Sequence, residues 1–186
     1  MNKKIFSKNC NLSSYTTIKV GGVAEYFAEP RSIEEFSNLI EWANLNKQRC
    51  QIIGAGSNLL INNIFIKGLV VCTKKLKSLK IDPYSGIVEV EAGVMLPTLS
   101  NSLAKNGLQG GEWAVGIPGT LGGAIYMNAG TSNLSLAKNL ISVKVINNKT
   151  LEKLEIQKKD INFEYRFSSF QKNHLTIISA KLHLSL

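Results

Sequence analysis

The feature that most constrains this chain is a glycine-rich stretch, GIPGTLGGAIYMNAG, at residues 116–130. It lies in an uncharged run over residues 113–137, but its glycines and proline weaken or break helices, which argues against a membrane helix. Glycine has no Cβ atom, so backbone N–H groups in such a stretch can approach a large flat ligand. The stretch indicates either a cofactor-binding surface or a tightly packed turn in an ordinary core, and glycine content alone leaves both open.

The size and charge of the chain narrow its possible partners. Its 186 residues suffice for one ordinary domain or two small lobes with a real core. A formal net charge of +9 indicates a polyanionic partner, which could be nucleic acid, an anionic membrane surface or a small molecule with several phosphates. The densest basic run, at residues 74–80, has no interleaved aromatic residues, so it is more typical of a solvated face than of a nucleic-acid groove.

The cysteines and the first residues indicate the compartment. Cys10, Cys50 and Cys72 are odd in number, far apart and in no metal-ligand spacing, so we expect neither a disulfide framework nor a metal site. Residues 5–14 form no apolar core of a signal peptide. No other segment reads as a membrane span, so the sequence predicts a cytoplasmic protein without a membrane partner.

Hydrophobic periodicity predicts an α+β chain of short strands and few helices. Helices are expected at 33–45, where Ser32 and Glu35 form a capping box, at 97–106, and briefly within the glycine-rich stretch. Strands are expected at 15–20, 24–28, 51–53, 59–61, 69–72, 87–92, 141–146, 151–156 and 176–184. The first two strands are predicted to pair as a hairpin, and any seam between two lobes is expected near residues 73–77.

A second glycine turn, Gly54-Ala55-Gly56-Ser57-Asn58, follows a predicted strand. It is not the dinucleotide-binding fingerprint, because a leucine replaces the third glycine and neither a following helix nor a later acidic residue is present. Its successive N–H groups can form an anion-binding nest, with the Ser57 hydroxyl and Asn58 amide as further donors. A structural glycine turn is an equally good interpretation.

The third candidate is Tyr165-Arg166, in the aromatic segment FEYRFSSF. A guanidinium offers a planar fork for a carboxylate or phosphate, and neighbouring rings can stack on a flat ligand. The alternative is a surface arginine that packs its stem on aromatic side chains. His174 and His183 are isolated, so we expect them to be structural rather than metal ligands.

Four segments in this order resemble one family: YTTIKVGG at 15–22, GAGSNLL at 54–60, the glycine-rich stretch at 116–130, and Tyr165-Arg166 with Ser168. The chain resembles the UDP-N-acetylenolpyruvoylglucosamine reductases over nearly its whole length. This resemblance implies a two-lobed α+β FAD-binding fold of the vanillyl-alcohol-oxidase (PCMH) type, with FAD between the lobes. The expected lobes are residues 1–73 and 74–186, without the C-terminal substrate-binding domain of the family, so that the chain is a fragment or a truncated product.

The resemblance also implies site residues. The FAD pyrophosphate would be held by Gly54, Ala55, Gly56, Ser57, Asn58 and Leu59. The flavin side would be lined by Gly116, Ile117, Pro118, Gly119, Gly122, Gly123 and Ala124, with Asn128 and Gly130 nearby. Tyr165 and Arg166 would face the substrate, and Arg166 is the one catalytic residue that the resemblance assigns to this chain.

The family's reaction is the NADPH-dependent reduction, through FAD, of the enolpyruvyl group of a UDP-sugar to UDP-N-acetylmuramate for peptidoglycan. FAD, NADPH and a UDP-sugar are all polyanions, which fits the positive charge of the chain. Two alternatives remain: a non-catalytic flavin-binding module, which would bind FAD without NADPH-dependent reduction, and a basic nucleic-acid-binding protein, which would bind without flavin and with a steep salt dependence.

Overall fold

The structure is a computed structural model, and it describes residues 6–62, 64–131 and 134–186. The chain folds into two compact units, Met1–Leu76 (unit 1) and Lys77–Leu186 (unit 2). The boundary between the two units falls between Leu76 and Lys77.

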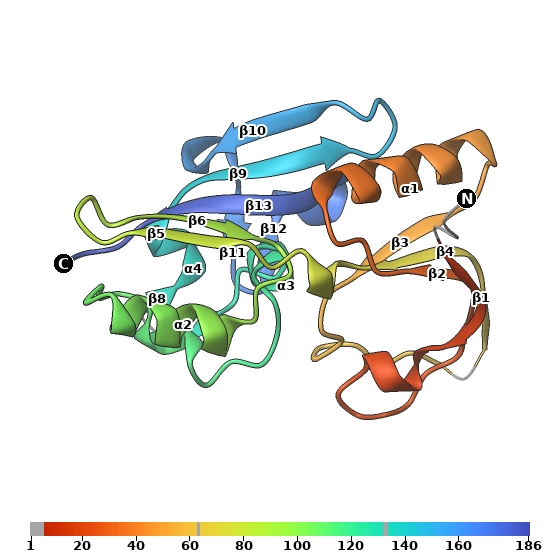
Figure 1. The fold of residues 1–186 in the computed structure, drawn as a ribbon, viewed down its shortest axis with the longest axis horizontal. Helices are drawn as coiled ribbons and strands as arrows, with labels where there is room; N and C mark the ends of the chain where they lie inside the picture. The colour runs from red at the N-terminus through yellow and green to blue at the C-terminus, as the bar shows by residue number, and fades with distance from the viewer. Residues whose placement is uncertain (1–5, 63, 132–133) are drawn as a thin grey trace. The chain divides into compact units, whose positions relative to one another are not determined.

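Unit 1 is built on a mixed sheet in the order β1-β2-β4-β3. Its strands are β1 (Ser7–Asn11), β2 (Val23–Ala28), β3 (Cys50–Ile53) and β4 (Phe65–Cys72). β1 is antiparallel to β2, whereas β4 runs parallel to both β2 and β3. One face packs into a core that contains Leu12, Phe27 and Val70. Figure 1 shows α1 (Ile33–Leu45) running along the same sheet.

The helix α1 confirms the capping-box prediction over its whole length. The Ser32 hydroxyl accepts a hydrogen bond from the Glu35 N–H at 3.1 Å, which satisfies one of the free donors of the first turn. The predicted apolar face is buried, since Phe36, Leu39 and Ile40 are at most 1% exposed.

The strands predicted at 15–20 and 59–61 are wrong. The N-terminal hairpin exists, but its first strand is β1. Residues Leu12–Tyr15 form a 3-10 helix (η1), and the following turn is held by the buried Thr16, whose hydroxyl donates to the Val20 carbonyl at 2.7 Å. The alternating β-branched residues at 15–20 thus form a packed loop instead of a strand, because the side-chain hydrogen bonds of threonine compete with strand pairing.

Unit 2 contains an antiparallel sheet in the order β10-β9-β13-β6-β5. Its strands are β5 (Leu79–Asp82), β6 (Ile87–Glu91), β9 (Leu140–Asn147), β10 (Lys153–Gln157) and β13 (Leu175–His183). The sequence predicts all of these except β5. Short pairs are formed by β7 (Gly130–Thr131) with β8 (Leu134–Ser135), and by β11 (Phe163–Glu164) with β12 (Phe167–Ser168).

The helices of unit 2 are α2 (Leu96–Lys105), α3 (Leu121–Tyr126) and α4 (Leu136–Asn139). α2 and the short α3 confirm the predicted helices, and Figure 1 shows α2 and α4 on the same side of the sheet. They share one core with the strands, which includes Val90, Leu99, Leu121, Ile125, Leu136, Val143 and Ala180. This packing fixes the glycine-rich stretch, because α3 lies within it.

Two kinds of feature are absent from the described residues. No helix among them is both long enough and apolar enough to cross a membrane. Nor do they contain a group of histidine, cysteine, aspartate or glutamate side chains that could hold a metal ion.

Candidate cofactor-binding site

The Gly54 turn of unit 1 directly follows β3 and is fixed at its start. The Gly54 carbonyl accepts from the Cys72 thiol at 3.4 Å, and the Ile53 carbonyl accepts from the Thr73 hydroxyl at 3.3 Å. Gly56 has φ 67°, and a Cβ atom there would collide with the Tyr15 carbonyl oxygen. Only glycine therefore fits this position without moving the backbone.

Gly56 also connects the Gly54 turn to the segment at residues 15–22. The Thr17 N–H donates to the Gly56 carbonyl at 3.3 Å, so the segment at 15–22 lies against the Gly54 turn. Burial and the nearby Glu29 carboxylate raise the pKa of Tyr15 to about 12. The Tyr15 hydroxyl donates a hydrogen bond to Glu29 Oε2 at 3.4 Å.

The Gly54 turn has unused hydrogen-bond donors. Within the described ranges, no group accepts a hydrogen bond from the backbone N–H groups of residues 54–58. Ser57 is half-buried and Asn58 is exposed, so the turn is open to a ligand. Successive N–H groups of this kind suit the oxygens of a phosphate or pyrophosphate. This observation fits the expected FAD pyrophosphate.

In unit 2, part of the glycine-rich stretch is a packed turn. The N–H groups of Leu121 and Gly122 donate to the carbonyls of Val94 and Ala92, each at 2.8 Å. A Cβ atom at Gly122 would lie 3.0 Å from the Ala92 Cβ atom. These two positions of α3 are therefore explained by packing against the segment that follows β6, and their N–H groups are already used.

Two other glycines of the stretch face open space. A Cβ atom at Gly116 or Gly119 would meet no atom within 4 Å, and Gly119 has φ 138°, which favours glycine. In the described part of the chain, their N–H groups donate to no acceptor. Both interpretations of the stretch thus hold for different positions: Gly122 packs, whereas Gly116 and Gly119 leave a surface that a flat cofactor can approach.

Tyr165 and Arg166 form the turn between β11 and β12. Arg166 has a left-handed backbone with φ 55°. Its Nη1 atom donates to the Gly130 carbonyl at 3.3 Å, and its guanidinium carbon lies 5.3 Å from the centre of the Tyr165 ring, which is 89% exposed. Arg166 forms no ion pair with a carboxylate of the described residues. The guanidinium can therefore bind an incoming anion.

Asn128 connects the glycine-rich stretch to this turn. Its Nδ2 atom donates to the Glu164 carbonyl at 2.9 Å, and its backbone has φ 44°. Its Oδ1 atom is buried and has no hydrogen-bond partner among the described residues. The structure therefore brings Asn128, Gly130 and Arg166 together in unit 2, while the Gly54 turn belongs to unit 1.

The sequence did not indicate Gln171, which contacts both the glycine-rich stretch and the turn that carries Arg166. Its Nε2 atom lies 2.8 Å from the Tyr126 carbonyl oxygen and 3.3 Å from the Arg166 carbonyl oxygen. Ser168, which is fully buried, also donates to the Tyr126 carbonyl, at 2.8 Å. A single glutamine in a polar segment carries no sequence signal, so only the structure could find it.

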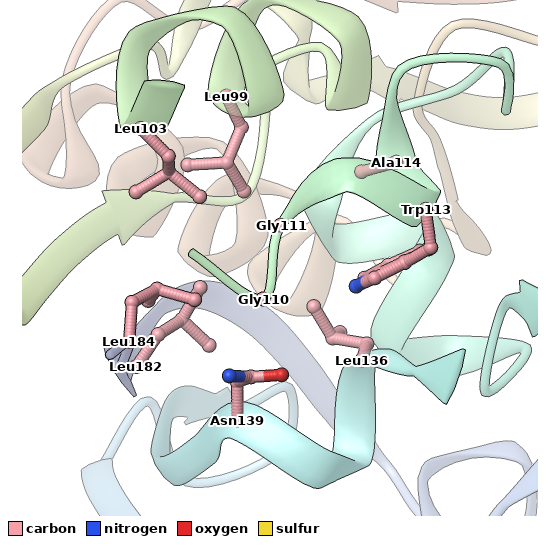
Figure 2. A pocket seen from close by; sticks show the side chains of 10 residues that line it. All are labelled: Leu99, Leu103, Gly110, Gly111, Trp113, Ala114, Leu136, Asn139, Leu182 and Leu184. Atoms are coloured by element: carbon pink, nitrogen blue, oxygen red, sulfur yellow. The ribbon is translucent and has the colours of Figure 1, made fainter. Parts of the chain in front are cut away.

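A small pocket elsewhere in unit 2 does not suit a cofactor. It is lined mainly by leucines of α2, α4 and the end of the chain, together with Trp113 and Asn139, as Figure 2 shows. The volume that the centre of a water molecule can occupy in it is about 10 Å³, so the pocket has room for one water at most.

Comparisons with known proteins identify relatives that bind FAD or are named as reductases. Residues 24–150 match the family model described as "FAD binding domain". The UDP-N-acetylenolpyruvoylglucosamine reductase of Prochlorococcus marinus subsp. pastoris is 71% identical over 177 residues, which cover 95% of this chain and 60% of the relative. The chain thus spans about 60% of the length of this relative.

Solved structures give the same result. The UDP-N-acetylenolpyruvylglucosamine reductase of Thermus caldophilus matches with a TM-score of 0.75 and 30% identity, over 95% of this chain and 61% of that one. An alkyldihydroxyacetonephosphate synthase matches with a TM-score of 0.64 and 17% identity, over 89% of this chain and 32% of that one, and shares the fold alone. The resemblance to the reductases and the α+β fold of the PCMH type are confirmed, and the chain belongs to the family of FAD binding domains.

Proposed function

We propose that this chain is the FAD-binding part of an NADPH-dependent reductase that converts the enolpyruvyl ether of a UDP-sugar into UDP-N-acetylmuramate for peptidoglycan synthesis. The observation that carries the proposal is the 71% identity to a relative named as this reductase, over 95% of the chain. We place the protein in the cytoplasm, where NADPH and nucleotide sugars are available.

Each unit offers its own set of proposed cofactor contacts. The free N–H groups of residues 54–58 would hold the FAD pyrophosphate, with Leu59 at the end of the turn. Ile117, Pro118, Gly123 and Ala124 would line the flavin side, together with Gly122 and the open faces of Gly116 and Gly119. The buried Asn128 Oδ1 atom would accept a hydrogen bond from a ligand, which its present surroundings do not supply. FAD, when bound, would supply the hydride-transfer chemistry.

Arg166 is proposed to bind the carboxylate of the enolpyruvyl group. A guanidinium without a carboxylate partner can form two parallel N–H···O bonds with such a group. During reduction, negative charge builds next to this carboxylate, so the same fixed cation would stabilise the transition state more than the ground state. Tyr165 stacks on the guanidinium and would face the substrate.

A chimera tests the proposal, because the chain spans only part of its relatives. The matching region of the Prochlorococcus reductase is replaced by these 186 residues, and formation of UDP-N-acetylmuramate is followed by mass spectrometry with NADPH and the enolpyruvyl sugar. We expect product and bound FAD. A folded chimera that binds no FAD contradicts the proposal.

The arginine provides a second arm of this test. Arg166→Ala in the chimera should keep FAD bound but lower kcat/KM by about a hundredfold or more, as for the loss of one charged transition-state contact. Binding of FAD without any product in the unmodified chimera would favour a non-catalytic flavin-binding module instead.

A further inference from the structure

Gln171 lies on the 3-10 helix Ser169–Lys172 (η5), directly after the Arg166 turn and β12. Its Nε2 atom lies within hydrogen-bond distance of the carbonyl oxygens of Tyr126 and Arg166, and 3.7 Å from the Met127 sulfur. A side-chain amide nitrogen carries two hydrogens. Gln171 can therefore donate to both carbonyls at once and bridge the end of α3 to the turn.

The turn needs such support because of its backbone. Arg166 has φ 55°, a left-handed conformation that is unfavourable for a residue with a Cβ atom. Strained positions of this kind persist where the surroundings hold them. Within the described residues, the side chain that donates to the carbonyl of Arg166 is that of Gln171.

The other side-chain hydrogen bonds hold different parts of the hairpin. Asn128 donates to the Glu164 carbonyl, before the turn, and Ser168 donates to the Tyr126 carbonyl, after it. The guanidinium of Arg166 is held by one contact of 3.3 Å to Gly130 and by the exposed Tyr165 ring. The ends of the hairpin are thus fixed independently, and Glu164 pairs with Phe167 on either side of the turn. Gln171 adds a side-chain hydrogen bond to the carbonyl of Arg166, within the turn itself.

We propose that Gln171 is a positioning residue that holds the Arg166 backbone in its left-handed conformation and thereby aims the guanidinium at the substrate carboxylate. The second half of this inference rests on the proposed function, in which Arg166 binds that carboxylate. Gln171 itself need not touch substrate or cofactor, since it acts through the carbonyl of Arg166.

The first test measures the backbone conformation of Arg166 by nuclear magnetic resonance, in the 186-residue chain without cofactor or substrate. A positive φ brings the amide hydrogen close to the Hα of the same residue, so Arg166 should give a strong nuclear Overhauser effect between the two. Gln171→Met keeps the length of the side chain but removes both donors. It should reduce this signal to the level of Phe167 in the following strand.

Two further variants keep this test decisive. Gln157→Met is the matched control, because Gln157 is exposed on the edge strand β10 and should leave the Arg166 signal unchanged. Gln171→Asn is a milder variant whose shorter amide cannot reach both carbonyls, and it replaces Gln171→Met if the latter fails to fold. An undiminished Arg166 signal in a folded Gln171 variant overturns the inference.

The second test reads substrate binding in the chimera described above. Gln171→Met should raise KM for the enolpyruvyl sugar about tenfold and leave the affinity for FAD unchanged, because only the carboxylate contact is misaligned. If Arg166→Ala neither raises KM nor lowers kcat, the proposed role of Arg166 is wrong. If Arg166→Ala raises KM and Gln171→Met does not, only the positioning role of Gln171 is wrong.

Discussion

The side-chain amide nitrogen of Asn128 donates a hydrogen bond of 2.9 Å to the main-chain carbonyl of Glu164, 36 positions further along the chain. This contact ties the glycine-rich stretch to the hairpin that carries Arg166. The proposed cofactor surface and the arginine proposed to bind a carboxylate are consequently parts of one local structure in unit 2, although they are far apart in the sequence.

The first prediction separates the contribution of the Asn128 backbone conformation to stability from that of its side chain. Asn128→Ala should lower the free energy of unfolding by about 2 kcal/mol, because it combines a left-handed backbone with the loss of one hydrogen bond. Asn128→Gly should cost only about half as much, since glycine tolerates φ 44°. Urea unfolding checks both values, and equal losses would show that the backbone conformation contributes nothing.

The second prediction concerns the open glycines. Gly116→Ala should leave the unfolding midpoint unchanged, because the new methyl group meets no protein atom within 4 Å. It should weaken FAD binding about tenfold, since the methyl group enters the proposed cofactor surface. Isothermal titration with FAD and a urea melt of the same variant provide the two measurements.

Gly122→Ala places a methyl group at a packed glycine and is compared with Gly116→Ala. Its methyl group would lie 3.0 Å from the Ala92 Cβ atom, so we expect a loss of stability of about 1–2 kcal/mol from overpacking. If Gly116→Ala destabilises the protein as much as Gly122→Ala does, the surface at Gly116 is packed rather than open.

The third prediction concerns Gly56. Gly56→Ala places a Cβ atom on the Tyr15 carbonyl oxygen at a position with φ 67°, so the turn must shift. We expect a loss of about 2 kcal/mol or more in the stability of unit 1. Hydrogen exchange at the β3 and β4 amides should report it, while β9 and β13 of unit 2 keep their protection. Equal loss of protection in both units would show that the effect is not local.

The fourth prediction concerns the thiols. Burial raises the pKa of Cys50 from 9.0 to about 12 and also raises that of Cys72. Both should react with a thiol reagent at pH 8 at least about tenfold more slowly than in the unfolded chain, because the thiolate is the reactive form. Mass spectrometry of the labelled protein gives the rate at each cysteine, and fast labelling of the half-buried Cys50 in the folded chain would contradict its raised pKa.

The raised pKa of Cys50 also makes the stability of the fold depend on pH. The folded chain binds the Cys50 proton more tightly than the unfolded chain, so this contribution to stability is complete below pH 9.0 and is lost as the pH rises toward about 12. The unfolding midpoint should therefore fall between pH 9 and pH 11, and fall less steeply in Cys50→Ser. An identical fall in this variant would assign the effect to other groups.

Local signals in the sequence predicted local structure well. α1 begins and ends where the capping box and apolar face place it, because its start is determined by a hydrogen bond between Ser32 and Glu35, three residues apart. The central strands β6, β9 and β13 were also predicted, since β6 alternates between buried and more exposed residues and β9 and β13 are rich in β-branched and other apolar residues.

Features set by long-range contacts could not be predicted. β1 is the polar segment SKNCN, which becomes a strand only because it pairs with β2. The Thr16 segment reads as a strand but is a packed loop beside Gly56. In the site, residue types and glycine spacing indicated the candidate positions, whereas the free N–H groups, the unpartnered Asn128 oxygen and Gln171 depend on tertiary contacts.

The most direct test of FAD binding by this chain is equilibrium dialysis of the purified 186 residues against FAD, with the flavin absorbance read at about 450 nm. We predict one FAD per chain, with weaker binding in Gly116→Ala and unchanged binding in Gln157→Met. A folded chain that retains no flavin at about 100 μM FAD, a concentration at which even a modest site is occupied, would contradict the central claim.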